Sequence, residues 1–297
     1  MVRVALCKTD KRREGTRDSL RALGVNPVKG KDVLIKPNFN TADPAPASTD
    51  NQTLVALIEQ IWEMGAKSIS LGERSWLPTQ EALIQKGILP VLWKWNVRVI
   101  DFDGLQEKDW VHLQSSDMHW KRGFRVARPI LETECLVSTC CLKTHQHGGV
   151  FTLSLKLHVG VVPTFRNGFD YMRELHHSRD QRKMIAEINE PFSPSLILLD
   201  GVEAFVTGGP TTGKRVRTNL FLASTDRVAI DAVGVAILKS VGTTEEIMGP
   251  KIFEQEQIAR AAELGIGVVS PSEIEIVAAD EESQPDRDRV RNVLSKG

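Results

Sequence analysis

The segment that decides the fold spans residues 135–160 and reads CLVSTCCLKTHQHGGVFTLSLKLHVG. It begins with a short apolar run, which is typical of a buried strand. A cationic loop, Lys143-Thr144-His145, is expected next, and Gly148 and Gly149 allow backbone conformations that a bulkier residue would not. In open α/β sheets, ligands bind beyond the carboxyl ends of the strands. We therefore interpret this segment as the functional centre; the alternative is a solvated turn whose basic residues face water.

Short apolar strands alternate with amphipathic helices along the rest of the chain. Strands are expected at residues 2–7, 33–35, 68–71, 97–100, 196–199, 220–223 and 274–277. Helices are expected at residues 16–24, 50–65, 79–87, within 165–189, directly after 226, and at 252–264. This alternation predicts an α/β fold with a mainly parallel sheet flanked by helices.

One α/β domain is expected over residues 1–278. Residues 104–128 lose the alternation of strand and helix, and tryptophans stand there among charged residues, so we expect a small irregular insertion, either a hairpin or a lid. Residues 279–297 are strongly charged and predict a frayed helix or a C-terminal tail.

The composition limits the classes of partner. Among 297 residues, 38 Lys and Arg balance 38 Asp and Glu, so no net field attracts nucleic acid, and only the basic segment 166–183 offers a local candidate. No apolar run approaches the roughly 18 residues that span a bilayer, so no membrane partner is expected. Four cysteines without a paired framework or a secretion signal predict a reduced, cytoplasmic protein.

Polar side chains follow several of the predicted strands. They are Lys36, Asn38, Glu73, Lys143, Thr144, His145, Asp200 and Asp226, with Asp231 about one helical turn after the last. Because parallel strands end at the same edge of a sheet, we expect these side chains to converge on one site. The alternative is that strand ends are polar only because they reach water.

A phosphate-binding loop is suggested by Gly208 to Lys214, which has the spacing Gly-x4-Gly-Lys. Arg215 stands where Ser or Thr would hold magnesium, and a strand rather than a helix is expected after it. We therefore interpret the segment as a Gly/Pro turn, although its backbone amides could line an anion pocket.

Metal ligation is a further alternative. Cys135, Cys140 and Cys141 lie close in sequence, but neighbouring residues of a strand point to opposite faces, which favours packing over a zinc or iron–sulfur site. A divalent metal would need histidines and carboxylates together, and no tight spacing such as His-x3-His occurs among them. The candidates for such a set are His145, His147, His158, Glu73, Asp200 and Asp231.

Several of these blocks together resemble the family of proteins known as domain of unknown function 362. In the family's order they are Val33–Asn38, Thr49, Met64–Lys67, Gly72-Glu73, Lys143–His145, Leu155-Lys156, Asp200-Gly201, Gly208–Pro210 and Ala223–Ala232. The resemblance covers about residues 30–268 and brings no established chemistry. Many members carry an appended ferredoxin-like module with two cysteine clusters, which this sequence lacks, so no electron-transfer role is implied. Where the family reads Leu-Lys-Asn, this chain has Leu155-Lys156-Leu157, and His158 is expected to replace the lost amide.

Two functions follow from this reading. The first is an enzyme that acts on a small anionic ligand, a carboxylate or a phosphate, by Lys/His acid–base chemistry. His145 would move the proton, because the pKa of histidine ordinarily lies near neutrality. The predicted catalytic residues are Lys143, His145 and Asp200. The predicted substrate-binding residues are Lys36, Asn38, Glu73, Thr144, Lys156, His158, Asp226 and Asp231.

The second function is a metal- or iron–sulfur-associated redox or binding protein that has no turnover of its own and serves a separate redox partner. The sequence leaves the reaction type and any cofactor open, since proton abstraction, isomerisation and hydrolysis all fit the same residues.

Overall fold

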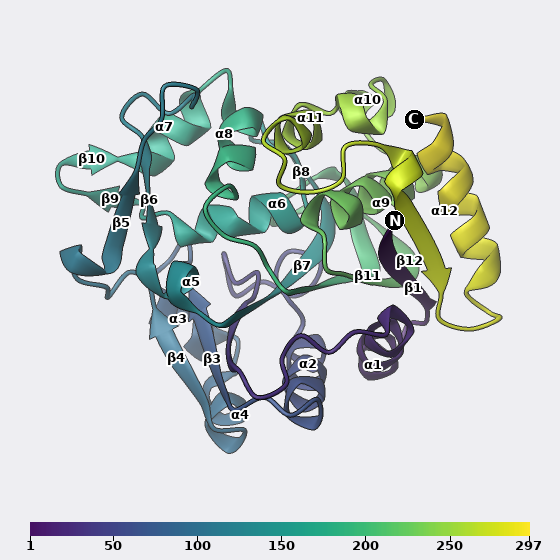
Figure 1. Cartoon of the computed structure of the whole chain (residues 1–297), viewed down its shortest axis with the longest axis horizontal. Helices are drawn as coiled ribbons and strands as arrows, with labels where there is room; N and C mark the ends of the chain where they lie inside the picture. Colours follow the sequence, from purple (N-terminus) through teal and green to yellow (C-terminus); the bar gives the residue numbers. More distant parts are fainter.

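A nine-stranded sheet lies between two layers of helices in the computed structural model, which describes residues 1–297 (Figure 1). The strand order is β13-β1-β12-β11-β7-β2-β3-β4, and β8 pairs with β7 outside this path. The strands are β1 (Val2–Lys8), β2 (Asp32–Lys36), β3 (Ser68–Glu73), β4 (Val97–Asp101), β7 (Cys135–His145), β8 (Val150–Thr152), β11 (Leu196–Gly208), β12 (Gly213–Ser224) and β13 (Ile274–Ala278).

Most neighbouring strands of this sheet are parallel. β4, β3, β2, β7 and β11 all run in one direction, and β1 is parallel to β13. β12 is antiparallel to both of its neighbours, and β8 folds back antiparallel to β7. The predicted α/β fold with a mainly parallel sheet is confirmed.

Two hydrophobic cores form because successive strand residues point to opposite faces of the sheet. On β2, Leu34 belongs to the larger core, whereas Val33 and Ile35 belong to the smaller one. The helices that contribute to the larger core are α5 (Arg128–Glu132), α6 (Ser154–Leu157), α7 (Tyr171–His177), α8 (Gln181–Ile188), α9 (Arg227–Val241), α10 (Glu245–Met248), α11 (Glu256–Glu263) and α12 (Gln284–Lys296). The smaller core is closed by α1 (Arg12–Leu23), α2 (Asn51–Glu63), α3 (Thr79–Gln85) and α4 (Leu89–Lys94).

The predicted insertion is a packed hairpin. Its strands β5 (Trp110–Leu113) and β6 (Phe124–Ala127) pair antiparallel and lead into α5 (Arg128–Glu132). Trp120 is buried, and its ring nitrogen donates to the Met184 carbonyl of α8 at 3.3 Å. The hairpin therefore belongs to the wall of the larger core.

One local prediction is wrong. Lys143, Thr144 and His145 lie at the end of β7 and not in a loop, because β8 returns beside them and pairs with all three. The helices predicted within residues 165–189 are confirmed as α7 and α8, and a short hairpin of β9 (Phe165–Arg166) and β10 (Phe169–Asp170) precedes them. Asn167 and Gly168 form its turn at positive φ, a conformation that asparagine and glycine tolerate better than other residues.

The charged C-terminal segment forms a regular helix. α12 packs against α9, and its Val290 and Leu294 join the larger core. α10 (Glu245–Met248) lies nearby at the same end of the molecule (Figure 1). The charges of α12 therefore mark the solvent face of an amphipathic helix.

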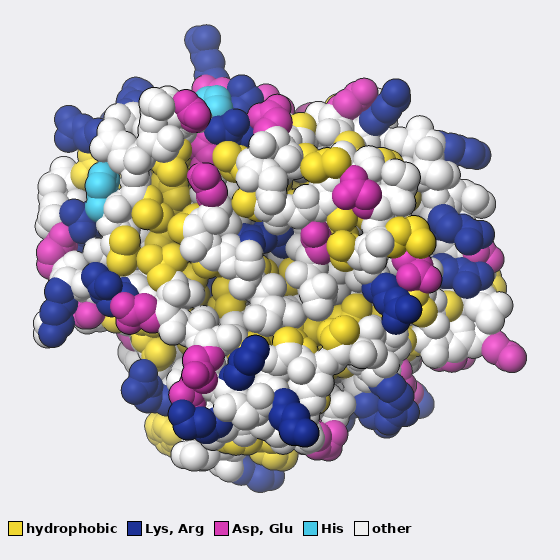
Figure 2. All heavy atoms as spheres, in the orientation of Figure 1, with side chains coloured by type: hydrophobic (Ala, Val, Ile, Leu, Met, Phe, Trp, Pro, Cys, Tyr) yellow, Lys and Arg dark blue, Asp and Glu magenta, His cyan; other side chains and the backbone are white.

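The surface carries both signs of charge, as expected from the equal numbers of basic and acidic residues. On the face drawn in Figure 2, basic and acidic side chains are interspersed, with no broad field of one sign. None of the helices combines the length and the apolar composition that crossing a bilayer requires.

Replacement of Leu294 by alanine tests the packing of the C-terminal helix. Because Leu294 is only 3% exposed, Leu294→Ala should lower the free energy of unfolding by about 2–5 kcal/mol. The exposed residue Asn292, on the same helix, provides the control, and Asn292→Ala should change stability little. Urea unfolding measures both; equal, small effects would mean that residues 279–297 are a loose tail.

Candidate functional site

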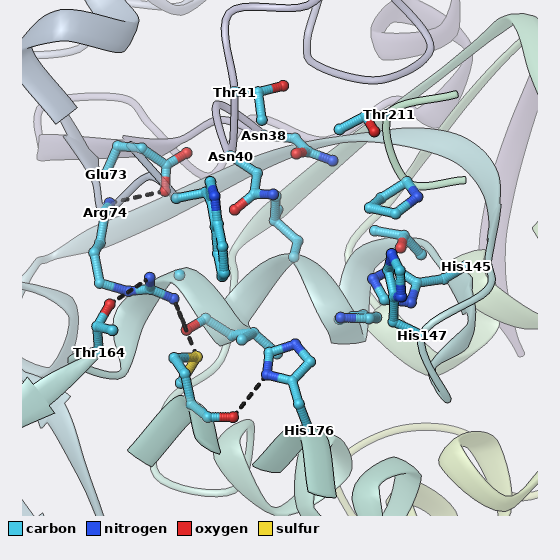
Figure 3. A pocket seen from close by; sticks show the side chains of 18 of the residues that line it. Asn38, Asn40, Thr41, Glu73, Arg74, His145, His147, Thr164, His176 and Thr211 are labelled. Atoms are coloured by element: carbon cyan, nitrogen blue, oxygen red, sulfur yellow. Dashed lines mark hydrogen bonds between the residues drawn. The ribbon is translucent and has the colours of Figure 1, made fainter. Parts of the chain in front are cut away.

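A pocket of about 900 Å³ opens beyond the carboxyl ends of β2, β3 and β7 (Figure 3). The strand ends contribute Lys36, Glu73, Lys143 and His145, and Asn38 follows β2 directly. α6, α7 and the turn between β11 and β12 complete the wall. The predicted convergence of strand-end residues therefore holds for these five side chains.

Glu73 forms the floor of the pocket together with Lys36. The Lys36 ammonium donates to Glu73 Oε1 at 2.5 Å and to the Pro37 carbonyl at 2.7 Å. The backbone amide of Phe39 donates to Glu73 Oε2 at 2.8 Å, and that of Arg74 donates to Oε1 at 2.9 Å. Burial raises the pKa of Glu73, but Lys36 and the two amides oppose this shift and stabilise the carboxylate.

Gly160 allows the neighbouring chain to lie directly on this ion pair. A Cβ atom at this position would stand 2.8 Å from Glu73 Oε1 and 3.0 Å from Lys36 Nζ. A side chain there would displace the pair, so the short 3₁₀ segment that contains Gly160 requires glycine.

Arg74 crosses from the end of β3 towards the opposite wall, where Figure 3 shows it beside Thr164. Its guanidinium donates to Thr164 Oγ1 at 3.0 Å and to the Val159 carbonyl at 3.2 Å, but to no carboxylate. Its Nε atom is buried without a protein partner. Burial lowers the pKa of Arg74, although a guanidinium stays protonated at any physiological pH.

Lys143 and Lys156 are two further buried cations. The Lys143 ammonium donates to the Ala47 carbonyl in the loop between β2 and α2, and it has no carboxylate within ion-pair distance. Lys156 lies on α6, and its ammonium has no hydrogen-bond or ion-pair partner in the protein. Burial lowers the pKa of Lys156 to about 7, and the charges of Lys143 and Arg74 add to this effect.

The pocket as a whole is cationic. Its charged side chains are Lys36, Arg74, Lys143, Lys156 and Arg173 on the positive side, and Glu73 and Asp170 on the negative side. Glu73 is already paired with Lys36, and Asp170 accepts from the backbone amide of Arg173 at the start of α7. The remaining positive charge has no counter-ion in the protein.

Histidines form the second feature of the wall. His145 and His147 pack edge to face with ring centroids 5.6 Å apart, and Figure 3 shows them across the pocket from Arg74. Burial and the nearby Lys156 and Lys143 lower the pKa of His145 far below its usual range, so its imidazole is neutral at physiological pH. On α7, the ring of His176 is held by the Met172 carbonyl at 2.7 Å.

Several buried polar atoms in this wall have no protein partner. Asn38 Nδ2, Arg74 Nε, His145 Nδ1 and Thr152 Oγ1 all belong to residues that line the pocket. Buried polar groups are normally hydrogen-bonded, so unpartnered donors that converge on a pocket indicate a place for a ligand that accepts hydrogen bonds.

Five predicted site residues lie outside the pocket, and Asp200, Thr144 and Asp226 are three of them. Asp200 accepts from Arg12 Nε at 2.9 Å and from Thr53 Oγ1 at 2.6 Å, and so ties β11 to α1 and α2. Thr144 is buried beside the pocket without lining it. Asp226 caps α9 at the opposite edge of the sheet, because β12 is antiparallel to β11; the expectation that it joins the other strand ends is wrong.

Asp231 and His158 support the pocket wall from behind. The Asp231 carboxylate accepts from the amides of Ser154 at 2.7 Å and Leu155 at 3.1 Å, which fixes the start of the helix that contains Lys156. His158 bonds Ser138 Oγ at 2.9 Å and Asn189 Oδ1 at 2.7 Å, so both ring nitrogens are occupied. His158 therefore does not take the place of a pocket-facing amide.

Sequence reasoning missed part of the wall. Arg74, Thr164, Arg173 and His176 all line the pocket. Trp76, which is 76% exposed, stands at its edge. Arg74 could have been predicted because it directly follows Glu73 in the sequence. Thr164, Arg173 and His176 come from segments far from the strand ends in the sequence, and no motif marks them.

The turn from Gly208 to Gly213 connects β11 and β12 as expected. Gly208 pairs with Gly213, and the amide of Gly209 donates to the Thr212 carbonyl at 2.6 Å. Pro210 and Thr211 at its tip line the pocket. The predicted Gly/Pro turn is therefore present, and a strand rather than a helix follows it.

Potential metal ligands do not converge. No group of three or more His, Cys, Asp or Glu side chains is arranged to hold a metal ion. All four cysteines are free and buried, and burial raises the pKa of Cys140 well above its usual value and that of Cys141 to about 11. Cys140 lies in the larger core, and Cys141, the next residue of β7, points to the opposite face of the sheet. The two thiols therefore pack on different sides of the strand.

Fold and site together define an α/β protein with a cationic pocket beyond the carboxyl edge of its sheet. A family model described as domain of unknown function (DUF362) matches residues 33–236, and the chain belongs to this family. The resemblance seen in the sequence motifs is thereby confirmed.

Two known proteins show further similarity to the chain. It is 24% identical over 250 residues to a thylakoid-associated protein of Synechocystis sp., and the matched region covers 82% of this chain and 74% of that protein. Among solved structures it is similar to the lactate racemase apoprotein from Thermoanaerobacterium thermosaccharolyticum, with a TM-score of 0.43 and 14% identity over 68% of this chain. The chain spans 50% of the length of that structure.

The buried pair of Lys36 and Glu73 generates a stability prediction. Glu73→Gln should lower the free energy of unfolding by about 3–5 kcal/mol, because it leaves the Lys36 ammonium buried without its counter-ion. The double variant Lys36→Met/Glu73→Gln removes both charges and should recover a large part of the loss. Urea unfolding of the two single variants and the double variant gives the coupling energy, and strictly additive effects would contradict the pairing.

Proposed function

We propose that the chain is an enzyme that acts on a small anionic metabolite, a carboxylate or a phosphate, by acid–base chemistry in this pocket. One observation supports the proposal above all: Arg74, Lys143 and Lys156 are buried cations at the pocket, and none has a carboxylate partner. Buried charges are costly unless they are paired. An anionic ligand would supply the missing partner.

The binding roles follow from position. Lys143, at the end of β7, and Arg74, directly after β3, both line the pocket and would neutralise the anionic group of the ligand. Asn38 Nδ2, which has no protein partner, would donate a hydrogen bond to it. Lys36 would shape the floor through Glu73 and contribute less to binding, because its charge is already compensated.

The acid–base role would fall on Lys156. Proton transfer is efficient when the pKa of the group lies near the working pH. Burial lowers the pKa of all three lysines of the pocket, and that of Lys156 to about 7. His145, whose pKa is lowered far below its usual range, would instead hydrogen-bond the ligand as a neutral imidazole. Asp200, which is bonded to Arg12 and Thr53, would instead support the fold behind the sheet.

The alternative of a metal- or iron–sulfur-associated redox protein draws no support from the arrangement of the cysteines and histidines. Nor does a nucleic-acid interface at residues 166–183, where Arg182 is paired with Glu256, Lys183 is paired with Asp180, and Arg173 lines the pocket. A cytoplasmic location is part of the proposal, since the free thiols suit a reducing compartment.

Anion binding tests the proposal directly. Phosphate or acetate should raise the melting temperature in a saturable manner, because either anion pairs with the buried cations. Lys143→Ala should weaken binding about 10- to 100-fold, the equivalent of one lost charge-assisted hydrogen bond. The control is Arg98→Gln, which removes an exposed cation of β4 away from the pocket and should leave binding unchanged. Equal responses in both variants would mean that the anions act on the general surface.

The pH dependence of binding provides a second test. Lys156 is protonated below its pKa of about 7, so acetate should bind more weakly as the pH rises through that value, while acetate itself stays ionised. Lys156→Gln should remove this dependence. Calorimetry between about pH 6 and pH 9 measures it. The other titratable or charged groups that surround Lys156 are Lys143, Arg74, His145, His147 and His176. A flat profile in the unmodified protein would contradict the assignment.

A further inference from the structure

Lys156 differs from the other lysines of the pocket in its bonding. The Lys36 ammonium is held by Glu73 and the Pro37 carbonyl, and the Lys143 ammonium is held by the Ala47 carbonyl. Lys156 has no such acceptor, although the side chain is 7% exposed and lines the pocket. Its nitrogen is therefore the lysine nitrogen that is free to react with a ligand.

Two unpartnered polar side chains line the same pocket as Lys156. A Cβ atom placed on Gly149 would stand 2.5 Å from Lys156 Cε and 3.1 Å from His145 Nδ1, so both side chains pack against the same glycine. His145 Nδ1 and Thr152 Oγ1 are both buried and unpartnered. An imidazole and a hydroxyl thus lie in the same wall as the amine.

The backbone that carries Lys156 is fixed. Asp231 holds the amides of Ser154 and Leu155, and Asn189 Nδ2 donates to the Leu155 carbonyl at 3.0 Å. These contacts make Asp231 and Asn189 positioning residues for the amine. A short helix of four residues is held in place in this way from two sides.

The electrostatics support the same role. A lysine becomes a nucleophile at neutral pH when burial or a neighbouring cation favours its neutral amine. Both conditions are met here, because burial and the charges of Lys143 and Arg74 lower the pKa of Lys156 to about 7.

We propose that Lys156 forms an imine with a carbonyl compound that also carries a carboxylate or phosphate group. The proposal rests on the proposed function, since the anionic group is the one that Lys143 and Arg74 bind. It narrows the substrate class from small anions in general to anionic aldehydes and ketones, such as 2-oxo acids.

The chemistry balances without another reactant. The neutral amine of Lys156 attacks the carbonyl carbon and forms a C–N bond. The two protons of the amine pass to the carbonyl oxygen, which leaves as water. When the imine nitrogen takes up a proton from solvent, the resulting iminium ion can receive the electron pair of an adjacent C–H bond, and the proton of that C–H bond passes to solvent water.

Reductive trapping tests this proposal. The full-length protein is incubated with glyoxylate, or in a second arm with glycolaldehyde phosphate, together with sodium cyanoborohydride near pH 7. Intact mass and peptide mapping then locate the adduct. We expect one adduct per chain at Lys156, formed at least ~10-fold faster than at exposed lysines such as Lys94.

Two variants complete the experiment. Lys156→Arg keeps the charge but cannot form the imine and should abolish the rapid adduct, whereas Lys94→Arg should leave it unchanged. If Lys156→Arg fails to fold, the peptide map of the unmodified chain decides alone.

The outcomes separate this proposal from the proposed function. An unmodified Lys156 with both carbonyl probes, while phosphate or acetate still stabilises the protein, overturns the imine and leaves the anion site standing. Adducts spread evenly over exposed lysines also overturn it. The absence of both trapping and stabilisation overturns the imine and the proposed function together.

Discussion

The buried carboxylate of Glu73 is the interaction on which the site depends. It joins the end of β2, the chain after it and the end of β3, because Lys36, the amide of Phe39 and the amide of Arg74 all donate to it. The chain at Gly160 rests on this pair, where no side chain fits. The pair therefore fixes the pocket floor and also determines how much positive charge is left over.

The uncompensated charge has a clear physical consequence. Arg74, Lys143 and Lys156 share a buried space in which the one buried carboxylate already belongs to Lys36. The ligand-free protein lowers the cost by bonding Arg74 and Lys143 to neutral oxygens and by depressing the pKa of Lys156. Burying these cations without a counter-ion lowers the stability of the fold, and an anionic ligand would supply the counter-ion. The same burial lowers the pKa of Lys156, so the site combines anion binding with a reactive amine. Stability sacrificed at functional sites is common in natural proteins.

Much of the sheet and half of the predicted site follow from the sequence for one reason. Apolar strands separated by helices imply parallel strands, and parallel strands bring their polar ends together, which placed Lys36, Glu73 and His145 correctly. The prediction for Asp226 was wrong because β12 runs antiparallel to β11. The short Gly/Pro turn between β11 and β12 indicates this reversal, since only antiparallel strands can be joined by so short a turn. Asp200 lies at a strand end, but its carboxylate is bonded to α1 and α2, which the position of a residue along a strand does not reveal.

The remaining wall could not be predicted because it depends on long-range packing. Thr164 and His176 come from segments without a repeating pattern, and their place beside Arg74 is set by the fold of the whole chain. The direction in which His158 points is likewise set by Ser138 and Asn189, which are distant in sequence.

The protonation of Lys156 in the ligand-free protein is the most direct test of the central claim that the pocket holds buried cations without a counter-ion. Carbon-13 NMR of the labelled lysine side chains, with Lys156→Arg for assignment, would follow its titration. We predict a resonance that titrates at a pKa of about 7 and moves to higher pH when acetate is saturating. A value near the ordinary lysine pKa of about 10.4, unchanged by acetate, would contradict the account.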